Sequence, residues 1–529
     1  MIQYEHGENL FGSQYSSLSY IGAYYKGDTL RKIALVPLKE INEISEIEKI
    51  VKSNANSILF ILPNSPAQTF SKKFQHLIHG LQSYLSTQTL YIPIYFVEET
   101  EELNEIVEIL KTEYKQSTGE ENTGILNYLG INQNLLHFSL SASDPKKIDT
   151  LNLENLYGFL EGTASASVQA DVKSGKTKIE KDDLDDDDEE KKEIPSNSKS
   201  TTSNPIIAIV AYYDSFGISP DMPSGINSNG SGIVALLELI RILSKFYENY
   251  ENVIKYDILF VLTSAGNLNF EGTQKFIDSL DPSIYENLHY VLCLDSLASI
   301  DKDDLFLHIS RLPKENEEEA NRLYKIFSAT AENMNLPLNY AKKKVFLTNN
   351  VVPWEHEQFS KKKILAGTLS SKENPVEDLF NRTLLTDTAT DMSRLKRNIK
   401  FLAESLLAFV FDYDIKNFTI FKDDENLLDE SNLESYLNYL KKISRFPLNI
   451  QKASHFNNDL MSYLNNYLVK TQRQVFELKD YKFFNSNSGN IKIYTVKSKL
   501  IDLYLLILIL LYLLAIYIFT KVFILLNIY

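Results

Sequence analysis

The chain has 529 residues, of which 44% are hydrophobic and 12% aromatic, and its formal net charge is −16. This length and composition allow a large buried core divided over two or three domains. An acidic chain of this kind lacks the basic surface of a protein that binds nucleic acid. The single cysteine, Cys293, excludes internal disulfides and cysteine-based zinc sites, and its apolar neighbours predict a buried strand.

Residues 1–165 are predicted to form an N-terminal α/β lobe. The apolar runs Ser57–Leu62 and Leu90–Val97 are typical of buried strands, and apolar residues between Ile41 and Val51 follow helical spacing. This lobe contains no motif that indicates a chemistry.

Residues 171–204 interrupt the folded pattern with an acidic insertion. Between Glu180 and Glu193, ten acidic residues stand against three lysines, a net charge of −7. Such a segment cannot bury enough apolar surface to fold, so a disordered loop is predicted. The run could bind calcium or a basic partner, but a solvated segment is the simpler interpretation.

Residues 205–415 alternate strands with helices, which predicts a mostly parallel central sheet between two helical layers, a three-layer α/β fold. Apolar residues from Ile233 to Leu243 mark one helical face. The predicted strands are Ile206–Tyr212, Asp257–Thr263, Tyr290–Asp295 and Ile364–Leu369, and Met392–Phe411 is predicted to be a closing helix.

Two further segments follow this domain. Residues 425–475 carry Leu and Tyr at helical spacing, and a helical membrane-proximal region is predicted over residues 425–498. Residues 503–520 form an uncharged apolar run long enough for a transmembrane helix in a lipid bilayer. Taken literally, the positive-inside rule with three lysines before this run and one after it puts the N-terminal part in the cytosol, in conflict with the luminal placement that a family resemblance implies below. The lysines are Lys492, Lys497, Lys499 and Lys521.

The stretch Val210–Gly217, followed by Gly225–Gly232 and a helix, resembles the M28-type zinc aminopeptidases. In that family a strand ends in His-x-Asp, a Gly-Ala-x-Asp-Asn-x-Ser-Gly motif precedes a helix, and later strands end in Glu-Glu and Asp. The resemblance implies two zinc ions held by His, Asp and Glu side chains. It also implies a glutamate that activates a bridging water.

Most of these residues are substituted here. The resemblance places Tyr212 at the first histidine ligand, Ser228 at the bridging aspartate, Gly266-Asn267 at the glutamate pair and Thr383 near the final histidine. Asp214 and Asp295 alone are retained. One carboxylate ligand cannot hold zinc against water, and no general base remains. We therefore predict no catalytic residue, no bound metal and no cofactor.

Glu355-His356 resembles an Asp-His-x-x-Phe segment near the site of active members. A lone histidine without partners is more often structural, and a structural role is the favoured interpretation for His356. Asp295 is likewise expected to accept backbone hydrogen bonds at the end of its strand.

Several segments, among them Ser228–Gly232, Phe270–Thr273 and Val291–Asp295, resemble the nicalin and nicastrin family of inactive M28 relatives, and its nicalin branch more closely. This resemblance implies a single-pass protein of the endoplasmic reticulum membrane with a large luminal domain. The implied partners are a Nodal-modulator protein, a small multi-spanning protein and the Sec61 translocon, which inserts multi-spanning membrane proteins. No signal sequence is visible after Met1, so a misplaced start is expected.

Three sequons would be glycosylation acceptors in a luminal domain: Asn229, Asn381 and Asn417. Two other functions stay open. One is a nicastrin-like substrate receptor of an intramembrane protease, and the other is an active metalloaminopeptidase that uses substituted ligands.

Overall fold

The computed structural model of the chain describes residues 1–63, 70–118, 136–162, 204–220, 222, 225–250, 254–376, 381–414, 420–423, 427–448, 450–485, 489–496 and 499–526. The chain divides into two compact units. Unit 1 comprises Met1–Asp149, Ile218–Asp221 and Asp480–Tyr529, and unit 2 comprises Thr150–Gly217 and Met222–Lys479. The predicted acidic insertion lies outside the described residues, except for Asn204.

Unit 1 contains a six-stranded sheet in the order β18-β8-β3-β4-β5-β7. Its parallel inner strands β4 (Ile33–Pro37) and β5 (Ser57–Leu62) are buried along their whole length, as expected for continuous apolar runs. The other elements of this layer are β3 (Leu18–Tyr24), β7 (Ile94–Glu98), β8 (Leu136–Leu140), β18 (Lys492–Thr495), η1 (Leu38–Glu40), α1 (Ile44–Val51), α2 (Lys72–Ser86) and α3 (Glu101–Thr118).

A second sheet of unit 1, in the order β17-β1-β2-β6, joins the two ends of the chain. Its strands are β1 (Gln3–His6), β2 (Asn9–Ser13), β6 (Thr89–Leu90) and β17 (Tyr481–Phe483). β1 and β17 are antiparallel, with Tyr4 opposite Phe483. Unit 1 is therefore built from both ends of the sequence, and the predicted lobe of residues 1–165 accounts for only part of it.

Unit 2 is built on an eight-stranded sheet in the order β14-β13-β15-β12-β10-β11-β9-β16. The central strands β10 (Ile206–Tyr212), β11 (Asp257–Thr263) and β12 (Leu288–Leu294) run parallel, and β10 pairs with β11 along its whole length. The sheet is mixed, because β9 pairs antiparallel with β11 and β16, and β13 with β15. The outer strands are β9 (Asn152–Leu160), β13 (Leu305–Ile309), β14 (Leu338–Lys342), β15 (Ala366–Ser370) and β16 (Val469–Glu477).

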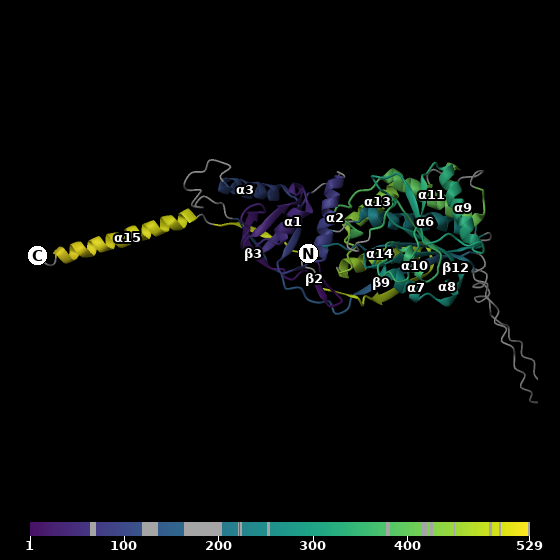
Figure 1. Cartoon of the computed structure of the whole chain (residues 1–529), viewed down its shortest axis with the longest axis horizontal. Helices are drawn as coiled ribbons and strands as arrows, with labels where there is room; N and C mark the ends of the chain where they lie inside the picture. The colour runs from purple at the N-terminus through teal and green to yellow at the C-terminus, as the bar shows by residue number, and fades with distance from the viewer. Residues whose placement is uncertain are drawn as a thin grey trace, which may run out of the picture. The chain divides into compact units, whose positions relative to one another are not determined.

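Helices cover both faces of this sheet, which gives the predicted three layers (Figure 1). On one face, Ile207 and Ile209 belong to the apolar core that contains α6 (Ser231–Asn249) and α11 (Met392–Phe411). On the other face, Ala208 and Val210 pack with α7 and α10. The remaining elements are α7 (Glu271–Asp278), α8 (Pro282–Asn287), α9 (Glu318–Asn333), α10 (His356–Lys361), α12 (Ile420–Asp423), α13 (Glu430–Lys442), α14 (Ile450–Tyr467) and a π-helical turn at Ile226–Gly230.

The C-terminal helix α15 (Lys499–Leu526) includes a candidate membrane span, Asp502–Ile524, of 23 residues with mean hydropathy 2.7. None of that span is buried against the protein. At 1.5 Å per residue it is about 34 Å long, enough to cross the hydrocarbon core of a bilayer. By length and composition the helix fits the predicted span at residues 503–520 and extends it at both ends.

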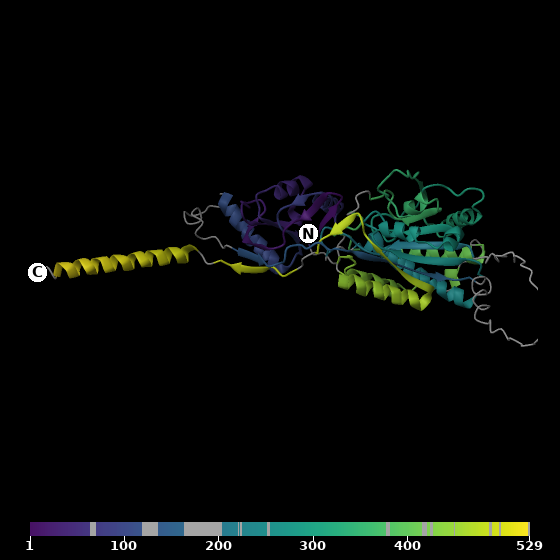
Figure 2. The same cartoon turned by 90° about the horizontal axis from the view of Figure 1, so that it is seen from below.

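The prediction that residues 425–498 are helical is wrong beyond Tyr467. Helices α13 and α14 are followed by β16, which pairs with β9, and then by β17 and β18 of unit 1 (Figure 2). β16 is a polar edge strand with a single buried residue, Phe476, so it lacks the apolar alternation that identifies a half-buried strand. The predicted strand Leu90–Val97 is also divided, because Pro93 has no backbone N–H to continue a ladder.

Candidate functional site

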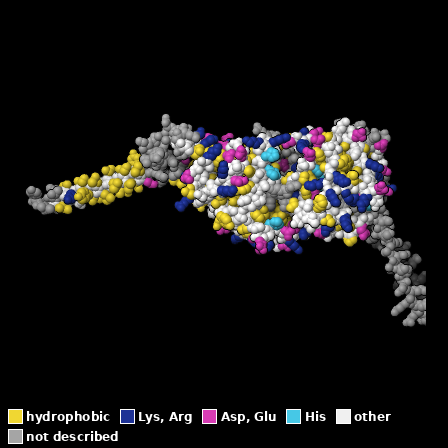
Figure 3. Space-filling model, in the orientation of Figure 1, with side chains coloured by type: hydrophobic (Ala, Val, Ile, Leu, Met, Phe, Trp, Pro, Cys, Tyr) yellow, Lys and Arg dark blue, Asp and Glu magenta, His cyan; other side chains and the backbone are white. Residues whose placement is uncertain are grey.

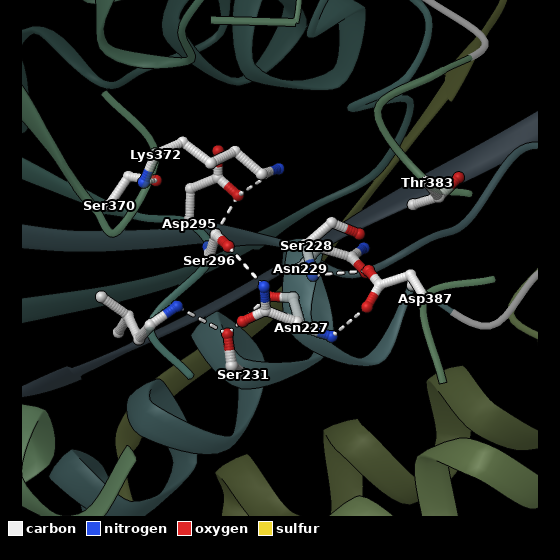
Figure 4. A network of polar contacts seen from close by, with 12 residues as sticks. Asn227, Ser228, Asn229, Ser231, Asp295, Ser296, Ser370, Lys372, Thr383 and Asp387 are labelled. Carbon is white, nitrogen blue, oxygen red and sulfur yellow. Dashed lines mark hydrogen bonds and ion pairs between the residues drawn. The ribbon is translucent and has the colours of Figure 1, made fainter. Parts of the chain in front are cut away.

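The substituted peptidase positions meet at one edge of the unit 2 sheet. Tyr212 ends β10, Gly266 follows β11, and Asp295 follows β12. Ser228 lies in the π-helical turn before α6 (Figure 4). Because parallel strands present their carboxyl ends at the same edge, this is where α/β folds place ligand and catalytic groups. The positions that the resemblance singled out therefore lie together at this edge of the sheet. What this edge can do chemically depends on the side chains that now occupy those positions.

The Tyr212 ring fills the space next to the general-base position. Tyr212 is 2% exposed and packs edge-on against Phe270, with ring centroids 5.6 Å apart. A Cβ atom at Gly266 would lie 2.1 Å from Cδ2 of Tyr212, far inside van der Waals contact. The tyrosine and the glycine are therefore complementary, and a glutamate at position 266 is sterically incompatible with this ring.

The retained Asp214 organises the loop after β11. Its buried carboxylate accepts hydrogen bonds from Ser264 Oγ at 3.0 Å and from the backbone N–H groups of Ala265 at 2.6 Å and Gly266 at 3.2 Å. Burial raises the pKa of Asp214 to about 6, against the effect of these hydrogen bonds. With tyrosine at position 212, the carboxylate has no histidine ligand to orient, and it holds the loop instead.

Two positions that the resemblance assigns to metal ligands are joined by a hydrogen bond. Asn267 Nδ2 donates to Thr383 Oγ1 at 2.9 Å, and the Thr383 hydroxyl donates to the Phe216 carbonyl at 2.5 Å. Both side chains are fully buried. Active members of the family would place a glutamate and a histidine here, so a direct bond between neutral groups replaces two metal ligands.

Ser228 occupies the bridging position, and a carboxylate from another segment lies beside it. Asp387 accepts from the backbone N–H groups of Asn227 at 2.9 Å and Ser228 at 2.8 Å, as Figure 4 shows. These groups lie at the start of the helical segment that continues into α6, where an anion is favoured by the helix dipole. Asp387 is therefore used as a helix cap.

Asp295 is held by protein groups in the way that a strand-end carboxylate is expected to be. Its Oδ1 accepts from the Ser296 N–H at 2.7 Å and lies 3.8 Å from Nζ of Lys372 (Figure 4). Burial raises the pKa of Asp295, and the Lys372 ammonium partly offsets that rise.

Two buried arginines, which the sequence pattern did not identify, cross-link the site. Arg382 donates to the carbonyls of Gly266 and Val352, each at 2.6 Å, and its guanidinium carbon lies 4.1 Å from the Phe270 ring centroid. Arg445 donates to Asn229 Oδ1 at 2.9 Å and to the Tyr213 carbonyl at 3.1 Å. Because both lie far from the motifs in the sequence, only the fold reveals their role.

Glu355 and His356 are both buried. Oε1 of Glu355 accepts from the hydroxyls of Thr263 and Thr273, each at 2.7 Å, and burial raises its pKa to about 7. His356 Nδ1 lies 2.9 Å from Thr368 Oγ1, and burial lowers its pKa to about 3. The neutral histidine packed against a threonine agrees with the structural role favoured by the sequence.

Two of the three possible glycosylation sites are buried in the folded unit. Asn229 is fully buried and donates to the Asp214 carbonyl at 2.6 Å, and Asn381 is 2% exposed. Neither position has room for a glycan in the folded unit. A sequon is a local pattern and carries no information about burial. Asn417 lies outside the described residues.

The side chains present do not fit a zinc site. Within the described ranges, no group of three or more His, Cys, Asp or Glu residues is placed to hold a metal ion. The positions that correspond to ligands offer a phenol ring, a hydroxyl, an amide and a threonine, and the two remaining carboxylates already accept protein hydrogen bonds.

Comparisons with known proteins agree with this geometry. The model for peptidase family M28 matches residues 193–377. The zebrafish (Danio rerio) protein "BOS complex subunit ncln" is 26% identical over 536 residues, which cover 96% of this chain and 86% of the relative. The human (Homo sapiens) protein "BOS complex subunit NCLN" is 25% identical over 524 residues, with coverage of 96% and 85%. "Nicalin" of Caenorhabditis elegans is 35% identical over 233 residues, 41% of each chain.

Among solved structures, the γ-secretase component nicastrin covers 94% of this chain and 98% of its own, with a TM-score of 0.57. With a sequence identity of 9%, this similarity supports a shared fold and no statement about a shared function. The chain is therefore similar over most of its length to proteins named as nicalin or as NCLN subunits of the BOS complex, and its unit 2 has the M28 peptidase fold.

Proposed function

We propose that this protein is a non-catalytic, membrane-anchored scaffold subunit of a complex in the endoplasmic reticulum membrane. Its large folded part would lie in the lumen and α15 would cross the bilayer. In this proposal the complex acts at the Sec61 translocon and assists the insertion of multi-spanning membrane proteins. Its other members would be a Nodal-modulator protein and a small multi-spanning protein.

The observation that carries the proposal is the packing of Tyr212 on Gly266. A Cβ at position 266 would lie 2.1 Å from the tyrosine ring, so the ring and a general base exclude each other. Restoring one catalytic residue would not restore the site, because the other ligand positions bond to each other or to the backbone. An M28 fold whose catalytic positions are substituted is best explained by a role in binding other proteins.

Two further observations support a membrane complex. The described part of the chain includes a helix of sufficient length and hydropathy to cross a bilayer. The zebrafish and human relatives, which align with 96% of this chain, are named as subunits of the BOS complex. Membership of the equivalent complex is therefore the simplest reading of the similarity.

The proposal is tested by purifying the tagged full chain from native membranes in mild detergent and identifying the co-purifying proteins by mass spectrometry. A tagged protein with an unrelated C-terminal anchor is the control. We expect enrichment of Sec61 and of the two named partner classes over that control. If no membrane protein is enriched, the scaffold proposal fails.

The same experiment distinguishes the nicastrin-like alternative, which is favoured only by the shared fold. Enrichment of a presenilin-type protease in place of Sec61 would identify a substrate receptor. Aminopeptidase activity is measured separately with the same purified protein. Hydrolysis of aminoacyl-4-nitroanilide substrates that is abolished by a zinc chelator would overturn the assignment of a non-catalytic subunit.

A further inference from the structure

One edge of the unit 2 sheet ends in a strand with a free side. β14 pairs in parallel with β13, and the described residues provide no strand on its other side. Most of β14 is accessible, including Tyr340, which is 38% exposed. A free strand edge presents unpaired backbone N–H and C=O groups, to which an extended segment of another chain can add.

The loop after β14 extends this edge with exposed apolar side chains. Phe346 is 57% exposed and Leu347 is 74% exposed, and Leu312 from the loop after β13 is 53% exposed. A backbone hydrogen bond of 3.0 Å from the Lys343 N–H to the Ile309 carbonyl holds the start of this loop against β13. Phe346 and Leu347 are adjacent in the chain, and neighbouring exposed apolar side chains, unlike isolated ones, mark a surface that binds another molecule.

A groove of about 220 Å³ lies beside this loop and is basic. Lys344, Lys363 and Arg311 line it, together with Ser310 and Ser360. In Figure 3, lysine and arginine side chains gather on this face of unit 2, in the region where Figure 1 labels α10.

Some of these cations already have partners. Arg311 is paired with Glu317, and Lys362 with Asp278, each at 2.6 Å. The surface cations without an ion pair to any described residue are Lys342, Lys343, Lys344 and Lys363. The Glu357 carboxylate interacts electrostatically with Lys343, and the surface as a whole keeps an excess of positive charge.

We propose that β14, the Lys342–Lys344 run, Phe346, Leu347 and the basic groove form one docking surface for an extended acidic segment of a partner protein. The segment would add as a strand to β14, place carboxylates at Lys344 and Lys363, and cover Leu347 with an apolar side chain. This inference rests on the proposed scaffold function and names the surface that would perform it.

Charge selects this occupant over a second copy of the chain. A second copy would present the same segment, residues 338–344, which contains no carboxylate that could pair with Lys342–Lys344. An acidic strand supplies those carboxylates and gains ion pairs.

The test uses the full chain in native membranes, with the photoreactive residue p-benzoylphenylalanine at Leu347 or, as a control, at the exposed Tyr250 at the far end of α6. After irradiation, the cross-linked peptides are sequenced by mass spectrometry. A synthetic peptide of the captured sequence is then used as competitor at low and high salt. The expected result is a cross-link from Leu347 to an acidic segment, which the peptide competes away and which weakens at high salt.

Charge reversal is the second measurement. The variant Lys342→Glu/Lys344→Glu/Lys363→Glu is compared with Lys245→Glu/Lys255→Glu/Lys325→Glu, three exposed lysines of the same unit without ion pairs to described residues. The first variant should reduce the Leu347 cross-link at least about tenfold and the control should not. The fluorescence of the buried Trp354 in both purified variants verifies that unit 2 is folded.

The outcomes separate this inference from the proposed function. If partners co-purify with the unmodified chain but the Leu347 cross-link is absent, reaches a lipid, or maps to a neutral or basic segment, the docking surface is wrong and the scaffold function stands. An equal cross-link in the two triple variants would also overturn the surface. If no partner co-purifies with the unmodified chain, both proposals fail.

Discussion

The substitution Gly266→Ala should destabilise unit 2 through a single steric contact. Gly266 has an ordinary backbone conformation, since the described glycines with positive φ are Gly7, Gly12 and Gly225, so alanine is not excluded by the backbone. The added Cβ would lie 2.1 Å from Cδ2 and 2.3 Å from Cγ of Tyr212. The ring has little room to move, because it is 2% exposed and packed against Phe270.

Overpacking in a dense core costs about 1–3 kcal/mol, and a contact this close to a confined ring belongs at the upper end, about 3 kcal/mol. In the background Tyr212→Ala, the clashing ring atoms are gone and only Cβ of residue 212 remains, 2.8 Å from the new Cβ. The cost of Gly266→Ala should then fall to about 1 kcal/mol, which gives a coupling energy of about 2 kcal/mol between the two positions.

The assay is urea unfolding of the full chain in detergent, followed by fluorescence of Trp354, the single tryptophan of the chain. Trp354 is buried in unit 2 and stacks on His308, so its signal reports this unit. Gly272→Ala is the matched control, since its Cβ would lie 2.0 Å from the Ser264 carbonyl oxygen, a contact that Tyr212→Ala does not relieve. Equal costs of Gly266→Ala in both backgrounds would refute the argument.

Three further predictions concern the same site. Because burial raises the pKa of Glu355 to about 7 from its ordinary 4.5, folded unit 2 binds more protons than the unfolded chain in this range. Its unfolding free energy should fall as the pH rises from 4.5 to 7, and Glu355→Gln should reduce the total fall over this range by on the order of 1–3 kcal/mol in urea titrations at several pH values. Arg382→Met leaves the carbonyls of Gly266 and Val352 without their donor and should lower the unfolding free energy by about 2–4 kcal/mol, measured by Trp354 fluorescence. A loss below about 1 kcal/mol would show that Arg382 does not stabilise these loops. The dialysed chain should retain far less than one zinc per molecule by elemental mass spectrometry, and a stoichiometric ion resistant to dialysis would contradict the lack of fit.

The sequence predicted the parts of the fold whose signal is local. Buried parallel strands are continuous apolar runs, so β5, β10 and β11 have the predicted bounds, and the amphipathic helix α11 does too. It failed for β16, β17 and β18, which are short or polar strands whose partners lie more than a hundred residues away. Their pairing depends on tertiary contacts that no local pattern encodes.

The site shows the same division. The family motif pointed to Tyr212, Ser228 and Gly266, which lie at one sheet edge, and the absence of bound zinc stays a prediction. The motif did not show what replaced the metal. The stabilising contacts come from Arg382 and Arg445, whose importance depends on which carbonyls the fold turns toward them.

These replacements explain how the site could lose its ions and keep its shape. In an active M28 enzyme, metal ions join the loops that follow three different strands. Here the loop after β11 is tied to β10 through Asp214 and to the segment near residue 383 through Asn267. The start of α6 is tied to the same segment through Asp387. Hydrogen bonds and one aromatic ring therefore supply the cross-links that metal coordination would supply. The sheet edge that carries the catalytic residues in M28 peptidases is thus part of the buried core of unit 2.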